Sequence, residues 1–264
     1  MIKRKKQENS NLKLAGLFLV FVLGLIILST FLKFFLIVKS SRFDGTHNFI
    51  VSFVGEGNSK VVSFSPKNKS LSILNVKGLE NNLSQTLEIP VDGKIIVKDF
   101  NDNKVPSLLL KSILSFDKPL KNITILDALR LFIFSETVSS NNINERSFTS
   151  NLNDAQRSTL VSLSFTDPSI YQENQSIQII NGADVYGIGG RLAAMVANIG
   201  GNVILVSTSD NPVQNSKITY FGDESYTVKK LSSYLDFPVE KSNQQGVADV
   251  IITIGKDALA SPKF

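Results

Sequence analysis

The sequence predicts an α/β (α+β) protein: an N-terminal transmembrane helix, a small mixed αβ domain and a βαββαβ C-terminal domain. Three observations carry this prediction. Residues 14–32 contain no charged side chain, residues 44–165 pass from strand-like runs to helical spacing of apolar residues, and residues 176–257 alternate short apolar runs with amphipathic helices.

The transmembrane helix is predicted at residues 14–38. The uncharged run is close to the roughly 20 apolar residues that a helix needs to cross a bilayer core. Lys33 interrupts the apolar sequence, but its long side chain can reach the head groups. A cleaved signal peptide is the alternative, and bulky Phe34 and Phe35 stand where small residues would mark its cleavage site. We therefore expect an uncleaved anchor.

Residues 1–13 are expected to be a basic cytoplasmic tail. Positive charge before the helix places the N-terminus inside and residues 40–264 outside, so the expected location is the cell membrane, single-pass. Residues 1–39 carry seven Lys and Arg and one Glu, a net charge of +6, and the whole chain carries +5. Residues 40–264 therefore carry −1, which argues against a nucleic-acid partner.

The first external domain is predicted at residues 44–165. Strand-like runs occupy residues 49–54, 60–65, 70–76 and 95–97, with turn residues at 66–69. Apolar residues then take helical spacing at 105–116 and 125–138, and Asn122 or Thr124 could cap the second helix. The polar segment 139–158 is expected to be a loop and a short helix.

The second external domain is predicted at residues 176–257, after a connector at 166–175 that is rich in Asp, Ser, Pro and amide side chains. Strands are expected at residues 177–180, 203–207, 217–221 and 250–254. Helices are expected at 187–199 and 226–235, and Gly200 and Gly201 end the first of them.

The composition excludes several kinds of chemistry. The chain has no Cys, which removes disulfides, thiolate metal sites and Cys nucleophiles. Its single His, His47, removes any site that needs two imidazoles, and it is expected to be an exposed residue near the membrane.

The second domain resembles the C-terminal domain of the LytR/CpsA/Psr cell-envelope family. A strand ends in Asn181-Gly182, a glycine-marked helix entry follows at residues 187–193, and a last strand closes in Gly255-Lys256-Asp257. The resemblance runs through about 80 residues in the expected order. It implies a cell-envelope location.

The first domain resembles a degenerate form of the same family's catalytic domain. Residues 89–100 are similar to the family's strand before its central helix, and Asp127-Ala128-Leu129 to its Gln-Ala-Leu helix. Active members transfer a polyprenyl-pyrophosphate-linked glycopolymer to peptidoglycan, using several Arg and Mg²⁺. Residues 74–78 stand where the family has a Pro-Arg-Asp signature, and residues 131–134 where Arg-x-Arg would follow.

Few arginines are left for such chemistry. Residues 44–165 contain only Arg130, Arg146 and Arg157, while a pyrophosphate calls for clustered guanidinium groups. We expect the transferase activity to be lost. The alternative is a divergent phosphotransferase that attaches glycopolymer to the wall through Arg130, Arg146 and bound Mg²⁺.

Candidate ligand-binding residues lie at the glycine-marked helix entry of the second domain. They are Asn181, Gly182, Gly187, Gly189, Gly190 and Arg191. The glycines also suggest a dinucleotide site, but Leu192 stands at the third glycine position, which favours a plain helix entry. Four tyrosines of this domain could offer a sugar-stacking face: Tyr186, Tyr220, Tyr226 and Tyr234.

The sequence thus predicts a membrane-anchored envelope protein that binds or scaffolds the cell wall without catalysis. The expected partners are the lipid bilayer through the anchor, peptidoglycan or an envelope glycopolymer, and an envelope protein. No metal site and no cofactor are expected, and Mg²⁺ belongs to the enzymatic alternative alone. A further alternative, an assembly protein that pairs with an active transferase, predicts an exposed apolar patch.

Overall fold

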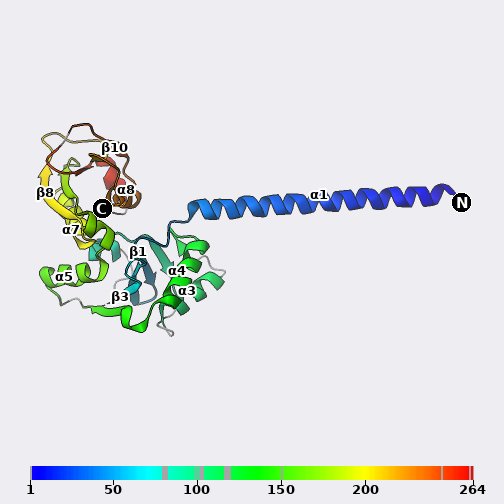
Figure 1. Ribbon diagram of the computed structural model, residues 1–264, viewed down its shortest axis with the longest axis horizontal. Helices are drawn as coiled ribbons and strands as arrows, with labels where there is room; N and C mark the ends of the chain where they lie inside the picture. The colour runs from blue at the N-terminus through cyan, green and yellow to red at the C-terminus, as the bar shows by residue number, and fades with distance from the viewer. Residues whose placement is uncertain are drawn as a thin grey trace.

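The structure of the chain is a computed structural model. It describes residues 2–78, 83–98, 100, 104–115, 120–149, 151–244, 246–261 and 263, with side chains from Lys13 onward. One long helix extends away from two α/β domains that lie against each other (Figure 1).

Helix α1 (Ile2–Ser40) contains the predicted membrane segment. Its portion Lys13–Ser40 has a mean hydropathy of 2.7 in its most apolar window, and none of that window is buried. Within the described residues, this is the one helix long and apolar enough to cross a membrane. Exposed leucines and phenylalanines from Leu14 to Leu36 suit a lipid environment, so α1 fits a membrane anchor.

The first domain is built on a six-stranded sheet with the strand order β5-β4-β1-β2-β3-β6. Strands β1, β2 and β3 form an antiparallel meander, β4 and β6 pair in parallel with β1 and β3, and β5 is antiparallel to β4. The strands are β1 (Phe49–Val54), β2 (Asn58–Ser65), β3 (Ser70–Lys77), β4 (Gly93–Ile96), β5 (Leu120–Lys121) and β6 (Ile143–Phe148).

Both faces of this sheet are covered by apolar side chains. Alternate residues such as Phe49, Val51 and Phe53 pack toward α3 (Val105–Leu114) and α4 (Ile125–Thr137). Their neighbours, such as Ile50, pack on the opposite side with α2 (Leu83–Leu87) and α5 (Asp154–Phe165). Because strand side chains alternate between faces, β1 is buried along its whole length. Apolar packing therefore holds helices on both faces of this sheet.

The second domain is a five-stranded sheet with two helices, in the strand order β10-β9-β11-β7-β8. Its pairs are parallel except for β11 with β9. The βαββαβ arrangement is confirmed, with the three-residue strand β10 added. The elements are β7 (Ser176–Asn181), α7 (Ile188–Asn198), β8 (Asn202–Thr208), β9 (Lys217–Tyr220), α8 (Tyr226–Leu235), β10 (Val239–Lys241), β11 (Val250–Ile254) and the 3₁₀ helix η2 (Lys256–Ala260).

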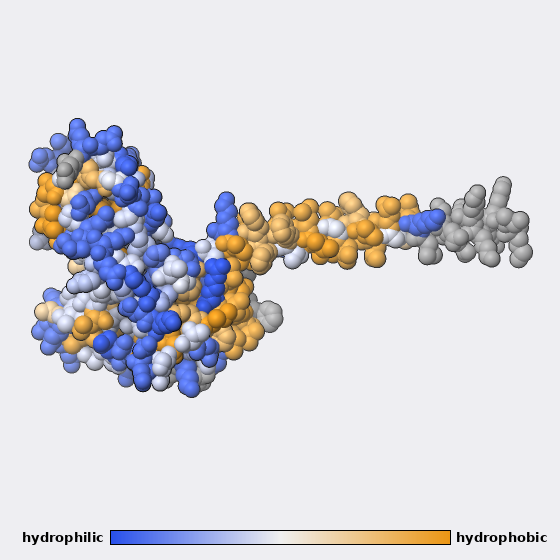
Figure 2. All heavy atoms as spheres, in the orientation of Figure 1, coloured by the Kyte–Doolittle hydropathy of each residue, from blue (hydrophilic) through white to orange (hydrophobic). Residues whose placement is uncertain are grey.

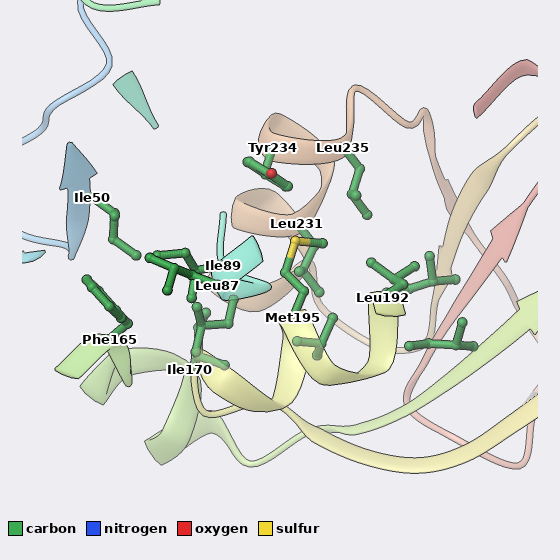
Figure 3. Close-up of a cluster of buried hydrophobic side chains, with 14 of the residues drawn as sticks. Ile50, Leu87, Ile89, Phe165, Ile170, Leu192, Met195, Leu231, Tyr234 and Leu235 are labelled. Atoms are coloured by element: carbon green, nitrogen blue, oxygen red, sulfur yellow. The ribbon is translucent and has the colours of Figure 1, made fainter. Parts of the chain in front are cut away.

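The two domains share one apolar core, which we call the domain junction. Figure 3 shows Leu87 and Ile89 of the first domain pointing toward Met195, Leu231 and Tyr234 of the second. The amide of Asn198 donates hydrogen bonds to the carbonyls of Leu87 and Glu88, and the hydroxyls of Ser84 and Tyr234 lie 2.6 Å apart. The domains are therefore packed as one unit.

Part of the expected connector is ordered as helix α6 (Pro168–Glu173). Asp167 caps this helix by accepting a hydrogen bond from the backbone N–H of Ser169, and Ile170 is buried in the shared core. The segment 166–175 thus packs between the two sheets because its one large aliphatic side chain finds an apolar site.

Two local features differ from or refine the sequence prediction. The polar segment 139–158, expected to be a loop and a short helix, ends in helix α5 but begins with the 3₁₀ turn η1 (Ser140–Asn142) and strand β6, whose backbone pairs with β3 although most of its side chains are exposed. Of the two proposed caps for α4, Thr124 is the one used, in a reciprocal capping box with Asp127.

Candidate functional site

A polar cleft of about 410 Å³ lies where the anchor connection, the first domain and helix α8 meet. This volume lies in the range of small-molecule sites. We call it the junction cleft. Its lining comprises Ser41, Arg42, Asp44, His47, Asn48, Phe49, Asp92, Tyr226, Lys229, Lys230 and Ser233.

A buried ion pair forms one side of the junction cleft. The Lys230 Nζ lies 2.8 Å from both carboxylate oxygens of Asp92, and it also donates to the carbonyl of Asn48 at 3.1 Å. Oδ2 of Asp92 also accepts the backbone N–H of Ile50 at 2.8 Å. The pair is mostly buried, with side-chain exposures of 12% for Lys230 and 6% for Asp92. It therefore links the two domains and is not free for a ligand.

A stacked ring pair forms another side of the junction cleft. The His47 imidazole lies on the Tyr226 ring with centroids 3.9 Å apart and an interplanar angle of 13°. The Tyr226 hydroxyl donates to Asp167 Oδ2 at 2.8 Å. Burial, followed by the negative charge of Asp167, raises the pKa of Tyr226, so the hydroxyl stays protonated. His47 keeps 37% of its side chain exposed.

Asp44 orients the imidazole of His47. Its carboxylate contacts His47 Nδ1 and accepts the backbone N–H groups of Thr46 and His47. Burial acts to raise the pKa of Asp44, but these hydrogen bonds outweigh it and lower the pKa to about 2. Asp44 is therefore ionised at neutral pH.

Two cations at the rim give the junction cleft its excess of positive charge. Arg42 is exposed and donates to the carbonyl and hydroxyl of Ser233. Lys229 is exposed and lies 3.8 Å from Glu224. The lining carries Arg42, Lys229 and Lys230 against Asp44 and Asp92, so guanidinium and ammonium donors lie beside an aromatic surface, a combination that suits an anionic saccharide.

A second cavity of about 460 Å³ lies at the position where the resemblance places the family's Pro-Arg-Asp signature. It is lined by lysine and not arginine, with Lys60, Asn75, Lys77 and Glu145 among its residues. The Glu145 carboxylate accepts a hydrogen bond from Asn75 at 2.7 Å and lies 3.5 Å from Lys60 Nζ. The Asn75 hydrogen bond and the Lys60 charge hold the pKa of Glu145 below its usual value, against a smaller opposing effect of burial.

The two candidate catalytic arginines lie in different parts of the first domain. Arg130 on α4 donates to the hydroxyl of Ser41 and the carbonyl of Phe43, so it holds the chain that leaves the anchor. Arg146 lies on edge strand β6. Its strand neighbours Glu145 and Ser147 line the second cavity, so the side chain of Arg146 belongs to the other face of the sheet.

The candidate ligand residues of the second domain form a helix entry. Asn181 is buried and closes the turn by accepting the N–H of Ala183 and donating to the carbonyl of Val185. A side chain at Gly182 would meet Val213 at 2.7 Å, and Gly187 has a φ of +81°.

The remaining members of that set divide between the sheet and the surface. Gly189 packs against the sheet, where a Cβ would lie 3.2 Å from Val206, while Gly190 and Arg191 are exposed. Arg191 lines a small cavity at the domain junction, and the described cavities include none of the other five.

The four tyrosines do not share one face. Tyr186 is fully exposed, Tyr220 lies on β9, Tyr234 is buried at the domain junction, and Tyr226 lines the junction cleft. Of these four tyrosines, Tyr226 lines the junction cleft, where it stacks on His47.

Several described carboxylates are already engaged by protein groups. No three His, Asp or Glu side chains converge within the described part of the chain. The buried carboxylate of Asp92 is already matched by Lys230, and Asp249 and Asp257 accept hydrogen bonds from Ser176 and Ser216.

Sequence reasoning missed several residues of the junction cleft. Asp92 lies within residues 89–100, which the resemblance singles out. Its buried partner Lys230 lies on an amphipathic helix whose sequence gives no sign of a buried ion pair. His47 was expected to be exposed and is half-buried against Tyr226. These residues lie far apart in the sequence, so their association depends on the packing of the two domains.

Residues 174–257 match a protein-family model described as LytR cell envelope-related transcriptional attenuator. The match confirms the resemblance of the second domain to a LytR C-terminal domain. No curated protein and no solved structure matches the chain. With its apolar N-terminal helix, the chain has the character of a cell-envelope-associated protein.

Proposed function

We propose that this chain is a single-pass membrane protein whose two external domains bind an anionic envelope glycan without catalysing its transfer. The basic tail at residues 1–13 supports a cytoplasmic N-terminus and an external position for residues 40–264. The LytR C-terminal domain supports a role at the cell envelope.

The observation that carries the binding role is the junction cleft. It combines the open ring surface of His47 with the exposed cations Arg42 and Lys229, directly after the anchor. A carbohydrate ring can pack on an aromatic plane, and guanidinium groups pair with carboxylate or phosphate substituents. A phosphate- or carboxylate-bearing sugar unit of peptidoglycan or of a wall glycopolymer is the proposed ligand.

The apolar core of the first domain and the lining of its second cavity support the absence of transferase activity. Apolar side chains occupy the space between its sheet and α3 and α4. The second cavity has lysines in place of arginines, and its carboxylate, Glu145, is engaged by Asn75 and Lys60. Arg130 and Arg146 lie apart, so they do not form a pyrophosphate clamp.

The test is sedimentation of the full chain in detergent with purified peptidoglycan, with and without its attached glycopolymer. We expect binding that weakens with salt, that falls at least five-fold in Arg42→Ala and His47→Ala, and that is unchanged in Arg191→Ala. Equal binding by all variants would contradict the cleft assignment. Mg²⁺-dependent transfer from a polyprenyl-pyrophosphate glycan to peptidoglycan would contradict the non-catalytic role.

A second candidate function, assembly with another envelope protein, is favoured by the free edge of β8. This strand ends the second sheet, and its consecutive apolar residues Ile204, Leu205 and Val206 are 48%, 39% and 45% exposed. Unpaired strand edges bind further strands. If this candidate is correct, Leu205→Lys abolishes cross-linking to envelope proteins in cells and leaves glycan binding intact.

A further inference from the structure

An exposed apolar surface covers α3 and α4 beside the base of the anchor. Its members are spaced four residues apart on each helix: Leu110 and Leu114 on α3, and Ile125, Leu129 and Ile133 on α4. Their exposed fractions range from 42% to 69%. We call this surface the α3–α4 face.

The α3–α4 face is not a loosely packed part of the core. The opposite side of α4 is buried, with Ala128 and Leu131 fully inside the first domain. Helix α4 is therefore apolar on both sides, which a helix that faces water on one side does not need. A contiguous apolar surface on a folded domain marks a contact with a protein or a membrane.

The position of the face relative to the anchor is fixed by hydrogen bonds. Helix α1 ends at Ser40, and the next three residues are bound to α4. The Asp127 Oδ1 accepts the Ser41 hydroxyl at 2.7 Å and the backbone N–H groups of Arg42 and Phe43 at 2.9 Å. Arg130 donates to the Phe43 carbonyl at 3.0 Å. These bonds therefore keep the α3–α4 face next to the base of α1.

The face also points toward the side where the bilayer lies. Figure 1 shows α3 and α4 on the side of the first domain from which α1 extends. Figure 2 shows apolar surface on this side, beside the base of the apolar helix. A bilayer that encloses α1 therefore meets this side of the domain first.

Two lysines and one glutamate border the face. Lys111 follows Leu110 on α3, Lys121 precedes α4, and Glu136 lies one turn beyond Ile133; all three are exposed. Lysine side chains at a membrane surface place their methylenes on apolar groups and their ammonium groups among the head groups.

We propose that the α3–α4 face lies in the head-group region of the bilayer that holds α1, so that the first domain rests on the membrane. This inference relies on the anchoring part of the proposed function but not on glycan binding or on the direction of insertion. It places the junction cleft next to the membrane surface.

The test uses the absence of Cys in the chain, which allows a single fluorescent label at a chosen position. The full chain is reconstituted in vesicles of phosphatidylethanolamine and phosphatidylglycerol with nitroxide-labelled lipids. Three variants carry an NBD label: Leu129→Cys on the face, Leu25→Cys in the anchor, and Leu163→Cys as the control. Leu163 is 65% exposed on α5.

We expect strong quenching and a blue-shifted emission at positions 25 and 129, and neither at position 163. Quenching at 25 without quenching at 129 would overturn the inference and leave the anchor intact. No quenching at 25 would overturn both. Energy transfer between copies labelled at position 129, without lipid quenching, would show that a second copy covers the face, and it would also overturn the inference.

A charge substitution gives an independent test of the same contact. With the label at Leu110→Cys, the added substitution Leu129→Glu is expected to reduce lipid quenching at least three-fold. The matched substitution Leu163→Glu is expected to leave it unchanged. Circular dichroism melting of each variant shows whether the fold is retained, and equal quenching in all folded variants would overturn the inference.

Discussion

The anchor junction, where residues 41–43 meet α4, and the domain junction each contain a buried aspartate, used in different ways. Asp127 at the anchor junction accepts five hydrogen bonds from neutral groups and has no cation partner among its described hydrogen bonds. Asp92 at the domain junction is paired with Lys230 inside a continuous apolar core.

The two aspartates therefore stabilise different kinds of contact. At the anchor junction the Asp127 carboxylate accepts the backbone N–H groups of Arg42 and Phe43, and it also takes part in the capping box of α4. At the domain junction apolar burial supplies the attraction, and the ion pair fixes one relative orientation of the domains because Asp92 belongs to the first domain and Lys230 to helix α8 of the second.

The largest expected effect concerns the ion pair of the domain junction, whose contribution can be measured apart from that of the apolar packing. Asp92→Ala leaves Lys230 buried without its anion, and we expect a loss of about 3–5 kcal/mol in the free energy of unfolding. The measurement is guanidinium unfolding in detergent, followed by circular dichroism. The double variant Asp92→Leu/Lys230→Met is expected to recover most of this loss. An equal loss in both variants would show that the packing around the pair dominates.

The next effect concerns the anchor junction alone. Asp127→Ala removes the carboxylate half of the α4 capping box and leaves the N–H groups of Arg42 and Phe43 without their acceptor, with an expected loss of about 2–3 kcal/mol. Hydrogen exchange should accelerate at residues 42 and 43 but not at the domain junction. Asp154→Ala is the control, since Asp154 is 95% exposed at the start of α5. Faster exchange at both junctions would mean that they are not independent.

A pH titration sharpens the same comparison. Burial acts to raise the pKa of Asp127, but hydrogen bonds from Thr124, Phe43 and Ser41 outweigh it and hold the pKa below its usual value. Its stabilisation is therefore complete above the unfolded pKa of about 3.9 and is lost as the pH falls through the lower folded pKa.

The amides of residues 42 and 43 in the wild-type protein should thus keep their protection, measured against the intrinsic exchange rate at each pH, from pH 8 to pH 5 and lose it only in acid. In Asp127→Asn the same two amides should be less protected at all these pH values, and their protection should depend less on acid. The same acid dependence in Asp127→Asn would assign the effect to another carboxylate.

The smallest effect is expected for Arg130. Its substitution tests whether this side chain holds the anchor connection or binds a substrate. Arg130→Ala removes bonds to Ser41 and Phe43, but Asp127 still holds both residues, so the expected loss is about 1 kcal/mol. Glycan sedimentation should not change, and Arg146→Ala serves as the comparison. A loss of glycan binding in both variants would revive the enzymatic alternative.

The comparison also shows which elements a local pattern could predict. Strand β1, helix α8 and strand β11 match their expected residues, because the two strands are short apolar runs rich in β-branched side chains and the helix has apolar residues at helical spacing. Strand β6 has no such pattern, since its side chains are mostly exposed and its place is decided by backbone pairing with β3. Helix α6 likewise forms where a connector was expected, because Ile170 is drawn into the shared core.

The sequence by itself determined the apolar helix, the order of strands and helices in the second domain and its resemblance to a LytR C-terminal domain. These features depend on residues that are close together along the chain. Only the tertiary structure decided that Asp92 meets Lys230, that His47 stacks on Tyr226 and that Arg130 holds the anchor connection. Each of these contacts joins segments more than 80 residues apart. Packing of the two domains makes the first two and packing of α4 against the chain after the anchor makes the third, and no local pattern encodes either.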